Sequence, residues 1–408
     1  MSAWSTIPIG DVVRVIGGGT PTRNNPDFYN GDIPWVTPKD MKRWKISDSQ
    51  VRITKLGLES SAAKLAPSNS VLIVVRSGVL KHTVPVAVNR CPVAINQDMK
   101  ALICSEKVDP SYLAYFIKER SGTILQWVRA TTADNFPVSE LMNLRIPLPP
   151  VGEQRRIAQI LDHVEALRAE RREALVVLDD LARSIFLDMF GDPLENPKGW
   201  PRLPLSEILL RIESGKSPQC LDRPAEKLEW GVLKLGAVTK CVYEPAENKA
   251  LPDEITPDRR HEVRKGDLLF SRKNTAALVA AVAYVRSTQP HLLLPDLIFR
   301  LVPKDHAPID KVYLHALFTY PSKRRKVQEL ASGSAASMLN ISKAKLLGFK
   351  CEVPPLELQQ EFSRRLDALE NLKSTHRSHL AELNALFAAL RHRAFNGELS
   401  QGDPGFAT

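Results

Sequence analysis

Two glycine-led segments are the places where this sequence could hold a phosphate group. Gly17-Gly18-Gly19 follows a strand-like stretch, but a dinucleotide-binding Gly-x-Gly-x-x-Gly motif fails because residue 22 is Thr. Gly215-Lys216-Ser217 resembles the end of a phosphate-binding loop, yet the glycine required at position 210 is Leu. We therefore interpret both segments as loops that need glycine for a tight turn.

No other residue pattern points to catalysis. The sequence lacks the Asn/Asp-Pro-Pro-aromatic tetrapeptide of amino-directed DNA methyltransferases. Glu247-Asn248-Lys249 carries the Glu-x-Lys half of a nuclease motif, without a Pro-Asp shortly before it. The nine histidines show no paired metal-ligand spacing, and the five cysteines form no Cys-x-x-Cys pair. We expect a chain that is not an enzyme, binds no metal and keeps its cysteines as reduced thiols.

The overall charge indicates a polyanionic partner. The formal net charge is +10 at pH 7, and the sequence pI is about 9.3. Lysine and arginine gain affinity for phosphates by releasing condensed counterions. No secretory signal opens the chain, and the longest apolar run, Ala276–Val285, is far shorter than the roughly 18 residues of a membrane span. We therefore expect a soluble, cytoplasmic protein.

An internal duplication organises the chain. Pro149–Phe190 and Pro354–Phe395 are two copies of one segment, aligned at a constant offset without a gap. A repeat of this length implies that the protein consists of two similar halves. The identical pairs include Pro149/Pro354, Pro150/Pro355, Gln154/Gln359, Leu161/Leu366, Asp162/Asp367, Glu165/Glu370, Leu167/Leu372, Leu175/Leu380, Leu178/Leu383, Leu181/Leu386 and Phe190/Phe395.

Both copies predict a long helix. Each starts with Pro-Pro and then has no proline from Val151 to Phe190 or from Leu356 to Phe395, which corresponds to a helix roughly 60 Å long. Apolar residues recur every three or four positions, as on one face of a coiled-coil helix. Because an isolated helix gains little without a partner, two equal stripes favour pairing of the helices over a solvated linker. The stripe residues are Ile157, Ile160, Val164, Leu167, Leu178, Leu181 and Ile185, and Phe362, Leu366, Leu369, Leu372, Leu380, Leu383 and Leu390.

The regions that precede the helices predict globular domains with short strands and few helices. We expect an α+β architecture, in which two globular domains with mixed sheets are each followed by a long helix. The predicted parts are residues 1–148, 149–192, 193–353 and 354–408, with strands at 71–75, 84–88, 268–271 and 278–285 and helices at 111–120 and 311–320. The predicted equivalents between the domains are 69–73 and 266–270, Gly19 and Gly215, Asp98 and Asp296, and the basic loops that begin at Arg76 and Arg272.

The junction between the first domain and its helix carries a family resemblance. Residues 145–157, Arg-Ile-Pro-Leu-Pro-Pro-Val-Gly-Glu-Gln-Arg-Arg-Ile, closely resemble the start of the conserved region in specificity subunits of type I restriction-modification systems. Residues 351–360 resemble the same element in the second half. Other matching segments are Gly18–Pro21, Ile33–Val36, Val75–Gly78 and Ala94–Asp98, while the second domain departs from the family at Gly231–Lys234 and Leu294–Asp296.

The resemblance implies a non-catalytic DNA-recognition subunit. In this family each target-recognition domain reads one half of a bipartite, asymmetric DNA site, and the helices pair antiparallel and dock methyltransferase subunits. Two such subunits are expected, with restriction or translocase subunits joined through them and S-adenosylmethionine bound on the methyltransferase subunits and not on this chain. Two readers on one face of B-DNA contact grooves ~34 Å apart. A helical spacer of roughly 60 Å would therefore act as a ruler.

Within the domains, polar and basic clusters are the candidates for contact with bases and phosphates. A single exposed charge is more often merely solvated, so the prediction rests on the clusters. The first-domain candidates are Thr20, Thr22, Arg23, Asn24, Lys39, Lys42, Arg43, Arg76, Lys81, Thr131, Thr132 and Asn135, with Trp44 beside them. The second-domain candidates are Lys216, Ser217, Lys234, Arg272, Lys273, Asn274, Ser334 and Asn340.

Two alternatives stay open at the level of sequence. The chain could be a stand-alone DNA-binding or coiled-coil scaffold protein that acts without enzyme partners. Failure to co-purify with a methyltransferase subunit would favour that function. An active DNA methyltransferase or nuclease is the second alternative, and it would need the motifs that the sequence lacks.

Overall fold

The computed structural model describes residues 4–129, 134–333 and 338–398. These residues form two compact units. The first unit contains the described residues up to Glu173 together with those from Arg377 onward, and the second contains Ala174–His376. Each unit therefore combines one globular domain with parts of two long helices.

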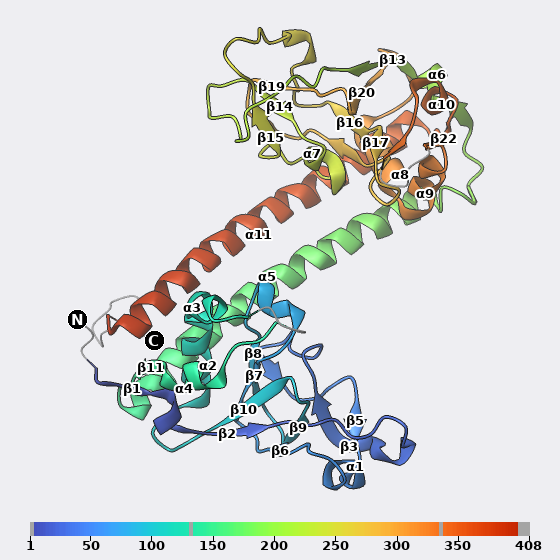
Figure 1. Ribbon diagram of the computed structural model, residues 1–408. Helices are drawn as coiled ribbons and strands as arrows, with labels where there is room; N and C mark the ends of the chain where they lie inside the picture. The colour runs from blue at the N-terminus through green and yellow to red at the C-terminus, as the bar shows by residue number, and fades with distance from the viewer. Residues whose placement is uncertain (1–3, 130–133, 334–337, 399–408) are drawn as a thin grey trace. The chain divides into compact units, whose positions relative to one another are not determined.

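The two long helices are α5, Val151–Phe190, and α11, Leu356–Asn396 (Figure 1). Their bounds confirm the prediction from the proline-free, periodic segments, which end at Phe190 and Phe395. The α+β class, with a globular domain before each long helix, is confirmed as well.

The first domain is built on two mixed sheets. The larger has the strand order β2-β10-β7-β8-β4 and the smaller β5-β3-β9-β6, while β1 pairs with β11. The strands are β1 Thr6–Pro8, β2 Val13–Gly17, β3 Tyr29–Val36, β4 Lys45–Ile46, β5 Arg52–Ile53, β6 Leu65–Ala66, β7 Val71–Val74, β8 Val86–Asn89, β9 Val93–Ile95, β10 Met99–Cys104 and β11 Arg145–Pro147. The helices are α1 Lys55–Glu59, α2 Pro110–Glu119, α3 Ser121–Gln126 and α4 Val138–Asn143, with 3-10 turns at Ile9–Asp11, Pro26–Phe28 and Gly78–Lys81.

The second domain repeats the central part of this plan. Its larger sheet has the order β13-β20-β16-β18 and the smaller β15-β14-β19, while β12 pairs with β22 and β17 with β21. The strands are β12 Arg202–Pro204, β13 Leu209–Ser214, β14 Gly231–Leu233, β15 Asn248–Ala250, β16 Leu268–Ser271, β17 Lys273–Asn274, β18 Val282–Tyr284, β19 Leu292–Leu293, β20 Ile298–Pro303, β21 Leu339–Asn340 and β22 Lys350–Glu352. The helices are α6 Leu205–Ile208, α7 Gly236–Thr239, α8 Lys311–Thr319, α9 Pro321–Gln328 and α10 Lys343–Leu347, with a 3-10 turn at Arg259–His261.

One strand prediction is wrong for more than half of its residues. Residues 278–285 read as a continuous apolar strand, but β18 covers only Val282–Tyr284. The preceding residues form a turn, in which the amides of Leu278 and Val279 donate to the carbonyl of Thr275. Ala280 has a φ of 61°, a left-handed conformation that interrupts an extended run.

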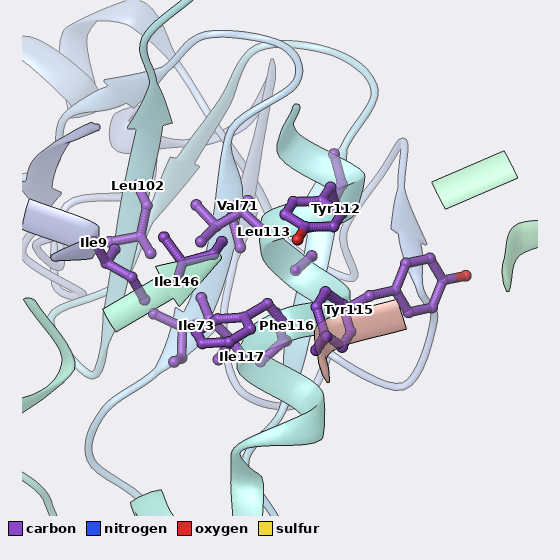
Figure 2. Close-up of a cluster of buried hydrophobic side chains, with 14 of the residues drawn as sticks. Ile9, Val71, Ile73, Leu102, Tyr112, Leu113, Tyr115, Phe116, Ile117 and Ile146 are labelled. Atoms are coloured by element: carbon purple, nitrogen blue, oxygen red, sulfur yellow. The ribbon is translucent and has the colours of Figure 1, made fainter. Parts of the chain in front are cut away.

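The core of the first unit forms where α2 packs against the larger sheet. Asp109 caps the helix by accepting a hydrogen bond from the amide of Tyr112 at 3.0 Å, and Pro110 occupies its first turn. All residues from Tyr112 to Ile117 are buried. Figure 2 shows their side chains packed with those of Ile9, Val71, Ile73, Leu102 and Ile146.

A buried glutamine fixes each domain to the start of its helix. Gln154 accepts a hydrogen bond from the amide of Asp109 at 2.9 Å, and its Nε2 donates to the carbonyls of Lys107 at 3.0 Å and Pro149 at 2.8 Å. Gln359 makes the equivalent contacts in the second unit, with the amide of Asp310 and the carbonyls of Pro308 and Pro354. Both side chains are fully buried. The identity of these residues in the two copies therefore has a structural cause.

The helices also meet within each unit. In the first unit, Ile157, Leu161 and Val164 share a core with Phe387, Leu390 and Phe395, and Arg168 donates to Asn384 at 2.7 Å. In the second, Phe186 and Phe190 pack against Phe362, and Lys373 pairs with Asp179 at 2.7 Å. The start of one helix thus meets the end of the other, so the predicted antiparallel pairing is confirmed within each unit.

Two stripe residues do not belong to the buried seam. Leu181 is 43% exposed and Leu372 is 46% exposed. At about 100° per residue, position 182 continues the line of the buried or half-buried Leu178, Ile185 and Met189, whereas Leu181 points to the side of it. The apolar spacing alone did not distinguish these neighbouring positions.

Candidate nucleic-acid interface

The central strands of the two domains provide a common frame for the polar residues. In the first domain Lys100 on β10 lies between Gly17 on β2 and Ile73 on β7. In the second, Phe299 on β20 lies between Ser214 on β13 and Phe270 on β16. Because Ile73 and Phe270 are equivalent in sequence, this register assigns to each of the remaining residues on these strands its equivalent in the other domain.

This register corrects two of the predicted equivalents. Gly215 corresponds to Gly18 and not to Gly19, and Asp296 corresponds to Gln97 and not to Asp98. The close approach of the chain agrees, since an added Cβ would lie 2.2 Å from the carbonyl oxygen of Ile95 at Gly18 and 1.8 Å from that of the equivalent Leu294 at Gly215. The run of three glycines allowed either alignment in sequence.

The basic loops are likewise shifted by one residue. Arg76 follows β7 at the position that Lys273 occupies after β16, and Arg272 corresponds to the buried Val75. Arg76 forms an isolated bridge with Asn135, and Lys273 pairs with Asn340.

We call Thr20, Arg76, Gln97, Asp98 and Asn135 the first strand-end cluster. The Thr20 hydroxyl donates to Oε1 of Gln97. Arg76 Nε lies 2.6 Å from Oδ1 of Asp98, with the Arg76 side chain 49% exposed. Because the Arg76 side chain is half exposed to water, an ion pair of this kind contributes only about 0–1 kcal/mol. Arg76 can therefore exchange Asp98 for a phosphate at little cost.

We call Ser217, Arg272, Lys273, Asp296 and Asn340 the second strand-end cluster. The Ser217 hydroxyl donates to Oδ1 of Asp296, whose amide donates back to Ser217 at 3.2 Å. Arg272 Nε donates to Oδ1 of Asn340 at 3.1 Å, and its guanidinium lies 5.1 Å from the centre of the Phe299 ring. The two clusters share their position and their hydroxyl contact but differ in charge.

Other predicted residues surround these clusters or lie elsewhere. Thr22, Arg23 and Asn24 are exposed in the loop after Thr20, Lys216 is exposed beside Ser217, and Asn274 follows Lys273 on β17. Lys81 is 65% exposed and lies 4.0 Å from Asp134, next to Asn135. Lys39, Lys42 and Arg43 are exposed after β3, and Thr131, Thr132 and Ser334 lie outside the described residues.

Two candidates have structural partners. Lys234 pairs with Glu247 at 2.9 Å, beside the smaller sheet of the second domain. Trp44 Nε1 donates to Asp162 on the long helix α5 at 3.1 Å, and its ring centre lies 4.2 Å from that of Tyr115 on α2, with the ring planes tilted by 30°. These partners attach the domain to α5 and give Trp44 a structural role.

Sequence reasoning missed the acceptors of the two clusters. Gln97, Asp98 and Asp296 are the partners of Thr20, Arg76 and Ser217. In the sequence, these residues lie in short polar segments between two buried strands. One such segment, Ala94–Asp98, resembles the family, but we predicted no role for its side chains. Lys345, whose Nζ lies 3.1 Å from the hydroxyl of Ser332, was also missed.

Possible metal ligands and two buried thiols bear on whether the described residues could carry catalytic chemistry. In the described part of the chain, no group of three or more His, Cys, Asp or Glu side chains could hold a metal ion. Burial raises the pKa of the Cys104 thiol and of the Cys351 thiol to about 12, so neither is a ready nucleophile at neutral pH. None of the helices between residues 4 and 398 that the structure describes has both the length and the apolar composition of a membrane span.

Sequence comparison relates the chain to known proteins. Residues 1–176 match the family described as the type I restriction modification DNA specificity domain. The chain is 38% identical over 175 residues to the specificity subunit of the type I restriction enzyme EcoR124I/EcoR124II of Escherichia coli, covering 42% of this chain and 43% of that protein. It is 21% identical over 423 residues to the EcoKI specificity subunit of Escherichia coli K12, covering 97% and 89%. In the first of these alignments the chain spans less than half of the relative's length.

A solved structure has the same fold. The crystal structure of a type I restriction-modification system S subunit from M. genitalium superposes with a TM-score of 0.62, covering 97% of this chain and 96% of that one at 14% sequence identity. At this identity the likeness concerns the fold alone.

Proposed function

We propose that the chain is a specificity subunit, the DNA-recognition component of a type I restriction-modification system, and has no catalytic activity of its own; the match of residues 1–176 to the specificity domain and the likeness to known specificity subunits support this proposal. Its two domains each read one half of a bipartite, asymmetric DNA site. The names of the relatives, all of them specificity subunits, support the role of recognition over that of modification or cleavage.

The observation that carries this proposal is the repetition of the strand-end cluster. Both domains present a hydroxyl, an amide or carboxylate, and at least one basic side chain at equivalent strand ends. Donors and acceptors of this kind read base edges, while the cations hold the phosphate backbone. Since Gln97 in one cluster is Asp296 in the other, the two half-sites should differ.

The partners follow from the same duplication. Each unit contains the start of one long helix, which a buried glutamine fixes to the domain, and the end of the other long helix. Two equivalent helical surfaces suit two methyltransferase subunits, which would bind S-adenosylmethionine and could carry restriction subunits. As part of this proposal, we infer that the protein is located in the cytoplasm, as expected from the sequence.

Sequencing of modified bases tests the function. The chain would be expressed with a methyltransferase subunit of a type I system from the same organism, and host DNA would be read for methylated motifs. We expect one bipartite motif with two different halves, and co-purification of the two proteins. A chain that binds DNA but never associates with a methyltransferase subunit would instead support the stand-alone scaffold.

A further inference from the structure

Gln97 and Asp296 occupy one equivalent position in the two domains. Each lies two residues before the strand that is second from the edge of the larger sheet, β10 or β20. Each accepts a hydrogen bond from a hydroxyl in the loop after the neighbouring strand, Thr20 or Ser217. The loops come this close because Gly18 and Gly215 lack a side chain at the crossing.

The hydroxyl contacts orient both side chains and leave part of each unused. Gln97 and Asp296 are exposed. Among the described residues, Nε2 of Gln97 and Oδ2 of Asp296 have no hydrogen-bond partner. Gln97 therefore presents one donor beside an acceptor, whereas Asp296 presents acceptors only.

Resting on the proposed function, we propose that Gln97 reads an adenine in the first half-site and that Asp296 reads a cytosine in the second. In the major groove adenine offers the N6 amino donor beside the N7 acceptor, which matches the two ends of an amide. Cytosine offers the N4 amino donor, which matches a carboxylate, and no acceptor that would repel it.

The charge of Asp296 separates base reading from backbone contact. A carboxylate repels phosphates, so it is unfavourable on a DNA-facing loop unless it meets an amino group of a base. Arg272 and Lys273 in the same cluster supply the attraction to the backbone. The carboxylate also disfavours guanine and thymine, which present acceptors in the major groove.

Two isosteric substitutions test the assignment in the complete methyltransferase complex. Gln97→Glu replaces the donor with an acceptor, and Asp296→Asn does the reverse. Gln50→Glu and Asp253→Asn, at exposed positions of the same domains, are the matched charge controls. The methylated motif of each variant would be determined by sequencing of modified bases. Affinities would be measured by titration against duplexes that carry each base pair at every half-site position.

We expect Gln97→Glu to weaken binding about tenfold to a hundredfold at one adenine of the first half-site and to favour cytosine there, and Asp296→Asn to shift one cytosine of the second half-site toward adenine. The controls should leave both motifs unchanged. If the base preferences stay unchanged, or change in the other half-site, the assignment is wrong while the proposed function stands. If the unmutated complex shows no bipartite motif, the proposed function itself fails and the assignment with it.

Discussion

At the scale of single residues, the structure separates side chains that hold the fold from those left for a partner. Trp44, although it lies among basic residues in sequence, is bound to Asp162 and Tyr115. Arg300 is only 10% exposed and is held by Glu213 at 2.6 Å and Asp267 at 2.9 Å. The Arg76 side chain, by contrast, is 49% exposed and pairs with a single carboxylate, that of Asp98. Composition counts these cations alike, and only their surroundings distinguish them.

Arg76→Ala should weaken binding to every DNA sequence. The change removes one cation and leaves the negative charge of Asp98 facing the DNA backbone. The magnitude of the slope of log affinity against log salt concentration should therefore fall by about 1. Lys273→Ala should act in the same way in the second domain. Binding titrations at several salt concentrations, on cognate and scrambled duplexes, measure both effects.

Arg52→Ala provides the control for Arg76, because the Arg52 side chain is 45% exposed against 49% for Arg76 and is also ion-paired, with Asp48 at 2.9 Å. An unchanged salt slope for Arg76→Ala, or an equal change for Arg52→Ala, would remove the strand-end cluster from the backbone contact. A loss confined to the cognate half-site would instead assign Arg76 to a guanine, at roughly 1–3 kcal/mol.

His315 should make the stability of the protein depend on pH. Burial, with a smaller contribution from nearby Arg286, lowers the pKa of His315 below its usual 6.5, and its Nε2 lies 3.0 Å from the carbonyl of Cys241. The unfolded chain therefore binds more protons, and the free energy of unfolding should fall as the pH drops through about 6.5. Urea unfolding at pH 7.5 and 5.5 should show a smaller fall for His315→Gln than for the exposed-site control His82→Gln.

At the scale of elements, the sequence predicted what local patterns determine. The bounds of α5 and α11 followed from prolines and apolar spacing, and the strands at 71–74 and 268–271 from short buried runs. The equivalence of Gly18 with Gly215 did not follow, because it depends on pairing between strands distant in the chain. The same reason explains why the hydroxyl contacts of Gln97 and Asp296 were not foreseen.

The buried glutamines should be costly to replace. Gln154→Met leaves the amide of Asp109 and two carbonyl groups without their partner. Because an unsatisfied buried polar group costs about 1–3 kcal/mol, we expect a loss of stability of at least about 2 kcal/mol. Thermal unfolding would measure it, with Gln159→Met, at an exposed position of the same helix, as the control. Equal melting temperatures for the two variants would contradict the assigned role.

At the scale of the whole molecule, the proposed ruler predicts a change in spacing. One heptad added to each helix, after Leu175 in α5 and after His376 in α11, keeps both apolar stripes in phase. It lengthens each helix by ~10 Å, which corresponds to about 3 base pairs of B-DNA. The methylated motif should keep both halves and gain a longer spacer. New half-site sequences with the old spacer would contradict the division of labour between domains and helices.

Exchange of one domain should change one half of the motif. Residues 1–148 would be replaced by those of a related subunit, with Asp109, Tyr112 and Tyr115 retained because they contact the long helices. The methylated motif of the hybrid should differ in a single half. Loss of all methylation from an assembled, folded complex would show that the two readers are not independent.

The composition of the first unit also sets an order of events during synthesis. Its core includes Phe387, Leu390 and Phe395, near the end of the described chain, and the ring of Phe395 packs on those of Tyr112 and Phe116. The second unit, Ala174–His376, is continuous in sequence and lies between the two parts of the chain that form the first unit. During synthesis on the ribosome, the first domain therefore keeps part of its apolar surface uncovered until the second domain has been translated and the end of α11 follows. Proteases and chaperones would meet the nascent chain at that surface.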